Sequence, residues 1–103
     1  MNPIIAQHLP ELLALCKKYR VATMYLFGSA ATGTFNEKSD FDFLIAFEEG
    51  LSFEEYADNY FELAWALEEL LGRDVDLVTE NSLSNPYFIA SVERTKQLIY
   101  AAA

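Results

Sequence analysis

The stretch Val21–Phe27 is apolar at nearly every position and is followed at once by Gly28. An apolar run of this length is typical of a strand covered on both faces, because successive side chains of a strand point to opposite sides. The chain must therefore supply helices or another layer for each face of a sheet. Its length suits one domain with a real core, so we expect residues 1–103 to form a single domain.

A second strand is expected at residues 41–47, where the side chains alternate between two faces. The side chains on one face are large and belong in the core: Phe41, Phe43, Ile45 and Phe47. Asp40 and Asp42 consequently stand side by side on the opposite face, at the start of the strand. Two like charges on one face repel each other unless a cation offsets them.

The N-terminal region has the marks of a helix. Asn2 and Pro3 are typical of a cap and a first helical residue, and Pro10 restarts or kinks the helix. A buried stripe with helical spacing follows: Leu9, Leu12, Leu13, Cys16 and Tyr19. Cys16 is thus expected to be a buried apolar residue.

A long helix is expected in the middle of the chain. Ser52 and Glu55 form a capping box at its start, and Gly72 ends it. Its expected core stripe consists of Phe53, Tyr56, Ala57, Tyr60, Ala64, Leu67 and Leu71. Its acidic residues are expected on a solvated face that could also meet a basic partner: Glu54, Asp58, Glu62, Glu68 and Glu69.

The remaining segments complete the fold. Residues 29–33 suit one short helical turn, residues 73–79 a third strand, and residues 97–101 a closing strand. Asn85 and Pro86 start a final helix. The order of elements predicts an α+β fold in which a mixed sheet of about four strands packs with about four helices.

Composition excludes several classes of function. Seven Lys plus Arg against sixteen Asp plus Glu give a net charge of −9, which argues against non-specific binding to nucleic acid. Cys16 and His8 are the only residues of their types, so neither an internal disulfide nor a Cys/His zinc cluster can form. Without a long apolar run or a signal-peptide pattern, we expect no membrane span and a cytoplasmic location.

The spacing of two short motifs indicates a site for phosphate and metal. Gly28-Ser29 ends a strand, and Asp40-Phe41-Asp42 opens the next after ten residues. Glycine lets the backbone turn tightly and approach a phosphate, and the serine offers a hydroxyl beside helix amides. Paired carboxylates suit magnesium, a hard cation that prefers oxygen ligands. Asp76, on the third strand, would complete the site, although Asp74 lies on the same face.

Three stretches resemble the minimal nucleotidyltransferases of the DNA polymerase beta-like superfamily. They are residues 26–33, residues 39–45 and residues 72–78, and the similarity extends over nearly the whole chain. The resemblance implies the polymerase beta-like nucleotidyltransferase fold. It also implies transfer of AMP from ATP to an acceptor hydroxyl, with release of pyrophosphate.

The family's motifs assign roles to the matching residues. By this resemblance, Asp40, Asp42 and Asp76 are catalytic and hold two magnesium ions. The match at Val75-Asp76-Leu77-Val78 favours Asp76 over Asp74. Gly28 and Ser29 would hold the outer phosphates of the nucleotide.

The chain departs from the family in one place. Many members carry an arginine directly after Gly-Ser, whereas this chain has Ala30 and Ala31. Lys38 is the nearest basic candidate for the missing phosphate contact.

Proteins of this size in the family commonly pair with a separate HEPN protein. The resemblance therefore implies an antitoxin that places AMP on a tyrosine of a HEPN toxin. A non-catalytic module that neutralises or scaffolds the HEPN partner by contact is the alternative. A small-molecule transferase of the aminoglycoside type is a third possibility, disfavoured because the sequence has no added acceptor-binding domain.

Overall fold

The strands form one mixed sheet, as the sequence predicts. Over residues 1–102, which the computed structural model describes, the sheet has four strands in the order β3-β2-β1-β4. They are β1 (Val21–Phe27), β2 (Phe41–Phe47), β3 (Val75–Thr79) and β4 (Gln97–Ala101). β1 pairs antiparallel with β2 and with β4, whereas β2 and β3 run parallel.

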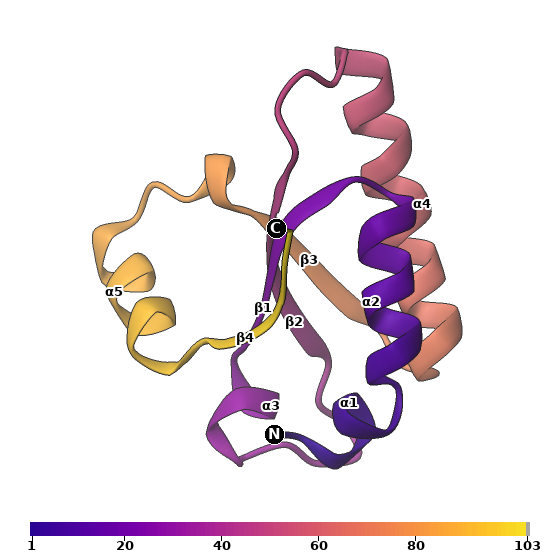
Figure 1. Cartoon of the computed structure of the whole chain (residues 1–103). Coiled ribbons are helices and arrows are strands. Elements are labelled where there is room, and N and C mark those ends of the chain that lie inside the picture. Colours follow the sequence, from indigo (N-terminus) through magenta and orange to yellow (C-terminus); the bar gives the residue numbers. More distant parts are fainter. Residues whose placement is uncertain (103) are drawn as a thin grey trace.

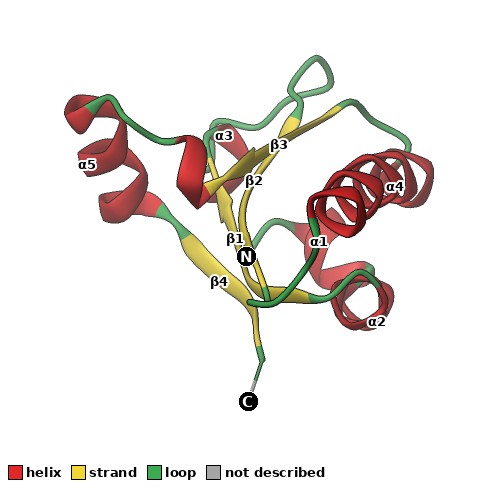
Figure 2. Ribbon diagram, turned by 90° about the horizontal axis from the view of Figure 1, so that it is seen from above, coloured by secondary structure: helices red, strands yellow, loops and turns green. Residues whose placement is uncertain are grey.

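Helices cover both faces of this sheet. They are α1 (Pro3–Gln7), α2 (Leu9–Lys18), α3 (Ser29–Thr32), α4 (Phe53–Leu71) and α5 (Pro86–Thr95), with a short 3-10 helix at Glu80–Ser82. Figures 1 and 2 show α2 and α4 on one side of the sheet and α5 on the other. This two-sided cover is what the apolar run of β1 requires. Within residues 1–102, no helix is long and apolar enough to cross a membrane.

The core is divided by the sheet into two parts. The larger part includes the fully buried residues Phe41, Phe43 and Ile45 of β2, with Leu12 and Cys16 of α2 and Leu63 and Leu67 of α4. Cys16 is buried as expected, and its Sγ lies 3.6 Å from Sδ of Met24. The smaller part, beneath α5, contains Phe27, Leu44 and Val92. Alternate residues of β2 thus fill both parts.

The buried stripe of α4 differs from the expected one at Phe53 and at Leu63, which the expected stripe did not include. Leu63, Leu67 and Leu71 are its buried residues. Phe53, expected in the stripe, is 87% exposed. It precedes the buried Leu71 by eighteen residues, which is five full turns, so it lies on the buried side of the helix but at the first helical position, ten residues before the first buried residue Leu63. The prediction for Phe53 was wrong because helical spacing gives the side of the helix on which a residue lies but not where along the helix the core ends.

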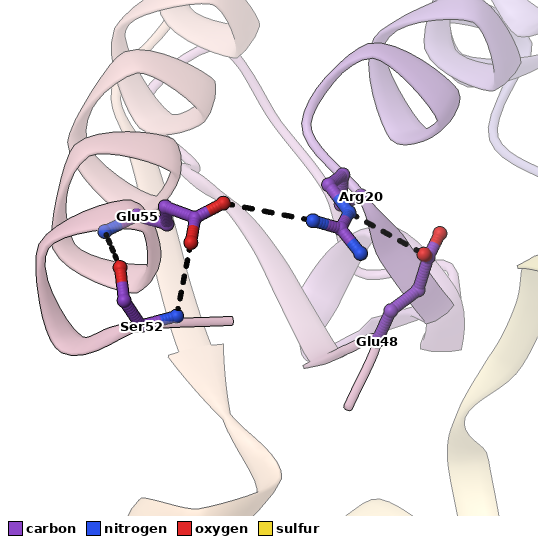
Figure 3. Close-up of polar contacts among 4 residues, drawn as sticks. All are labelled: Arg20, Glu48, Ser52 and Glu55. Carbon is purple, nitrogen blue, oxygen red and sulfur yellow. Dashed lines mark hydrogen bonds and ion pairs between the residues drawn. The ribbon is translucent and has the colours of Figure 1, made fainter. Parts of the chain in front are cut away.

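Arg20 connects three elements near the start of α4 (Figure 3). Its Nε lies 3.5 Å from Oε1 of Glu48, just after β2, and its Nη1 lies 3.6 Å from Oε2 of Glu55. Glu55 also completes the predicted capping box: its backbone N–H donates to Oγ of Ser52, and its Oε1 accepts from the Ser52 N–H. These ion pairs are exposed, so we expect each to contribute well under about 1 kcal/mol.

Candidate active site

The predicted glycine-serine bend forms directly after β1. Gly28 has φ 71° and ψ −154°, and its carbonyl accepts hydrogen bonds from the N–H groups of Ala31 (3.1 Å) and Thr32 (3.2 Å). Ser29 is the first residue of α3. The first amides of a helix have no acceptor within it, so of the four residues of α3 only Ser29 and Ala30 have N–H groups that a ligand or water can use.

The strand register brings two of the predicted carboxylates together. Asp42 of β2 is paired with Asp76 of β3 on one side and with Phe27 of β1 on the other. Side chains of directly opposed residues share a face of the sheet, with Cβ atoms about 5 Å apart. Asp42 therefore lies between Asp76 and the residue that precedes Gly28.

The charges around Asp42 disfavour its ionised form. Partial burial, followed by the negative charges of Asp76 and Asp40, raises the pKa of Asp42 to about 6. A divalent cation between the carboxylates would remove the repulsion that causes part of this shift. Burial and two neighbouring carboxylates thus make Asp42 a candidate site residue.

The carboxylates of Asp42 and Asp76 are enough to bind magnesium, provided that water and a nucleotide supply its other ligands. Within the described residues, no three His, Cys, Asp or Glu side chains are gathered into a ready-made metal site. Magnesium, however, usually binds through one or two carboxylates, with water and substrate phosphates as its other ligands. Asp42 and Asp76 can supply the two carboxylates, and a nucleotide would supply the phosphates.

A cavity of about 360 Å³ lies in front of these carboxylates. Gly28, Asp42 and Asp76 line one side of it, and α5 forms the opposite wall. Its volume is within the range of small-molecule sites. The strand ends that carry Asp42 and Asp76, the glycine bend and α5 thus border a space of suitable size for part of a nucleotide.

The other predicted site residues lie outside this cavity. Asp40 is exposed and lines a separate shallow depression together with Lys38, Arg73 and Asp74. Its charge still acts on Asp42. Lys38 is exposed, and the structure does not bring it to Gly28 or Asp42. Ser29 adjoins Gly28 but is not part of the cavity lining.

Two side chains of α4 fix the strand that carries Asp76. Oε2 of Glu68 accepts a hydrogen bond from the N–H of Val75 (3.2 Å), and Oη of Tyr60 donates to the carbonyl of Leu77 (2.6 Å). Both backbone groups face the free edge of β3, because alternate residues of a strand direct these groups to opposite edges. The bonds satisfy an edge that would otherwise be open, immediately before and after Asp76.

Arg73 fixes the loop that leads to Asp40. Its Nη1 donates to the carbonyls of Asn36 (2.9 Å) and Ser39 (3.0 Å). Its guanidinium also lies over the ring of Phe35, 4.6 Å from the centroid, and that ring stacks on Phe41. One side chain thus ties the loop between the glycine bend and β2 to the end of α4.

Sequence reasoning did not identify Arg73 or the α5 wall as parts of the site. A single arginine after a helix-ending glycine carries no pattern that reveals a partner 34 or 37 residues away. On α5, the spacing of Phe88, Ser91 and Thr95 marks one helix face. That signal is present in the sequence, but it does not say what the face meets.

Known proteins match the chain over most of its length. Residues 12–99 match the family model described as a nucleotidyltransferase domain. MJ1379 of Methanocaldococcus jannaschii, named as a candidate protein adenylyltransferase, is 42% identical over 83 residues, which are 81% of this chain and 79% of that protein.

Solved structures share the fold. One, described as a candidate minimal nucleotidyltransferase, has a TM-score of 0.71 and 36% identity and covers 90% of each chain. A toxin-antitoxin crystal structure with AMP-PNP has a TM-score of 0.71 and 26% identity, over 91% of this chain and 73% of that one. The structure of the tri-AMPylated Shewanella oneidensis HEPN toxin in complex with MNT antitoxin, at 22% identity and a TM-score of 0.66, shares the fold over 94% of this chain and 72% of that one. The expected α+β fold is confirmed.

Proposed function

This chain belongs to the nucleotidyltransferase domain family, and we propose that it transfers AMP from ATP to a hydroxyl group of a partner protein. A bond forms between the acceptor oxygen and the α-phosphorus while the bond from that phosphorus to pyrophosphate breaks. The hydroxyl proton passes to water in the same step, and pyrophosphate leaves with the electron pair of the broken bond. The observation that carries the proposal is the position of Asp42, which adjoins both the Gly28 bend and Asp76.

The residues take distinct roles in this proposal. Gly28 and Ser29 hold the outer phosphates through the glycine bend and the first amides of α3. Asp42 and Asp76 would hold the metal, with Asp76 nearer the acceptor oxygen, and Asp40 as a third ligand stays a prediction because it lies outside the cavity. Two bound magnesium ions would stabilise negative charge on the attacking and leaving oxygens. Lys38 as a phosphate contact stays a prediction, since its exposed side chain lies with Asp40 outside the cavity.

The partner follows from the family and its relatives. We propose a HEPN protein with an acceptor tyrosine, which this chain silences as the antitoxin of a toxin-antitoxin pair. The name of MJ1379 supports a protein acceptor, and the solved complexes support ATP and a HEPN partner. The net charge of −9 agrees with recognition of a protein rather than of nucleic acid.

The test is direct. The purified chain is incubated with ATP, magnesium and the product of the neighbouring open reading frame, and the intact mass of that product is measured. The proposal expects a gain of one or more AMP groups, which is lost with Asp42→Asn and kept with Asp58→Asn. Asp58 lies on the exposed face of α4, so its variant removes the same charge away from the site. No mass gain with the unsubstituted chain would overturn the proposal.

One observation favours a second candidate, a module that neutralises the HEPN partner by contact alone. The family pattern that this chain resembles implies an arginine directly after Gly-Ser, where this chain has Ala30 and Ala31, and Ala30 is packed in the core. The chain therefore lacks one cationic phosphate contact. Tight binding to the partner without a mass gain would support this candidate. AMP found instead on an added aminoglycoside would support the small-molecule transferase.

A further inference from the structure

The proposed reaction leaves half of the substrate without an assigned contact. The triphosphate belongs at the glycine bend and the carboxylates, but the adenosine portion also needs a surface. The cavity in front of Asp42 and Asp76 continues from these groups to α5. Its far wall therefore lies where a nucleotide anchored by its phosphates can extend.

That wall has the chemistry of a nucleoside site. Phe88, Ser91 and Thr95 line the cavity from α5, at spacings that place them on one face of the helix. They offer an aromatic ring and two hydroxyl groups, of which that of Thr95 donates to the carbonyl of Ser91 (3.0 Å) and can only accept from a ligand. The charged neighbours Glu93 and Arg94 are exposed and are not part of the lining. A neutral wall with an aromatic ring suits a sugar and a base rather than phosphate.

The ring of Phe88 is both fixed and accessible. It packs edge-on against Phe27 of β1, with centroids 5.9 Å apart and an interplanar angle of 83°. It nevertheless keeps 41% of its surface exposed, so part of the ring remains open to a ligand. An aromatic ring held in place in this way is a suitable platform for a base, because every base has a stacking face.

We propose that this face of α5 binds the nucleoside of the ATP substrate, with Phe88 against the base and the hydroxyls of Ser91 and Thr95 near the sugar. The inference rests on the proposed function and adds the subsite that recognises the nucleoside. The acceptor occupies the other approach, past the exposed side chain of Asp76. A hydroxyl carried by a folded partner requires such an open approach.

Binding of ATP and of inorganic tripolyphosphate, each with magnesium and without acceptor, separates the two halves of the site. The unsubstituted chain should bind both, ATP more tightly. Phe88→Leu, which keeps apolar packing against Phe27, should weaken ATP binding about tenfold and leave tripolyphosphate binding unchanged. Phe88→Trp should restore ATP binding. Tyr87→Ala is the matched control, because Tyr87 adjoins Phe88, is 87% exposed and is not part of the cavity lining.

The outcomes distinguish failure of this inference from failure of the proposed function. Equal ATP affinity in the Phe88→Leu variant and the unsubstituted chain would overturn the nucleoside wall and leave the phosphate site intact. Weakened binding of both ligands by Phe88→Leu would also overturn it, since the effect would not be specific to the nucleoside. If neither ligand binds the unsubstituted chain, the proposed function fails and this inference fails with it.

Discussion

The carboxylate of Asp42 occupies the space that a side chain at Gly28 would need. A Cβ atom built on Gly28 would overlap Oδ2 of Asp42 and lie 3.1 Å from its Cγ. Gly28 also has φ +71°, which disfavours any L side chain. Gly28 and Asp42 are thus in close contact, although fourteen positions separate them along the chain.

This contact predicts the effect of Gly28→Ala. The new methyl group must displace the Asp42 carboxylate, so we expect loss of nucleotide binding and of AMP transfer by at least about tenfold. With φ 71° and ψ −154°, Gly28 is in a backbone region that essentially only glycine adopts, which adds a stability loss of about 1–3 kcal/mol. Nucleotide affinity and thermal unfolding measure the two effects separately.

Gly50→Ala is the control for backbone strain. Gly50 has φ +88°, and a Cβ there would meet nothing within 4 Å. The variant should therefore lose stability through its positive φ but keep nucleotide binding. Equal losses of binding in both glycine variants would contradict the role of the Gly28–Asp42 contact.

Asp42→Asn should stabilise the metal-free protein while it abolishes transfer. Because the pKa of Asp42 is raised to about 6, the folded state holds a proton more tightly than the unfolded state. The stability of the unsubstituted chain therefore falls as pH rises from about 4 to about 6. The asparagine variant lacks this loss, so its advantage should be absent below about pH 4 and complete above about pH 6.

The expected size of this gain is small but measurable. The pKa shift corresponds to at most about 3 kcal/mol, which solvent around a partly exposed carboxylate reduces to about 1 kcal/mol. Thermal unfolding in a chelator across this pH range tests it, with Asp58→Asn as the charge-matched control. A constant difference between Asp42→Asn and the unsubstituted chain at all pH values would contradict the assignment.

Local patterns in the sequence predict most of this fold, because the boundaries are marked by residues with strong local preferences. Asn2 and Asn85 do cap helices, Ser52 and Glu55 do form a capping box, and Gly72 does end α4 in a left-handed conformation. The strand at residues 97–101 is also confirmed. Each of these features depends on a few neighbouring residues.

The candidate site likewise has features that sequence spacing can predict and features that it cannot. The pairing of Asp42 with Asp76 follows from strand alternation and order, so sequence spacing can predict it. The contacts of Arg73 with the loop at residues 36–39, and the position of α5 over the carboxylates, depend on tertiary packing. Spacing along a single chain carries no information about such contacts.

Tyr60→Phe tests how β3 is held at the edge of the sheet. The variant removes the 2.6 Å hydrogen bond from Oη of Tyr60 to the carbonyl of Leu77. We expect it to lower the free energy of unfolding by about 1 kcal/mol, because the carbonyl loses its partner at a partly buried edge. Urea unfolding should show a lower midpoint with an unchanged slope. Tyr87→Phe, at an exposed position on α5, should leave the midpoint unchanged.

Arg73 is expected to act on the reaction by holding the loop that ends at Asp40. Lysine at this position keeps the positive charge, but as a point charge on a flexible stem it cannot reproduce the planar guanidinium that bonds two carbonyls and stacks on Phe35. We therefore expect Arg73→Lys to lower kcat for AMP transfer about tenfold, to change the KM for ATP less, and to reduce stability only slightly. Arg94→Lys, in the last turn of α5, provides the matched control and should behave as the unsubstituted chain. If Arg73→Lys kept full kcat, charge alone would account for the role of this residue, and the positioning of the loop by its hydrogen bonds would be refuted.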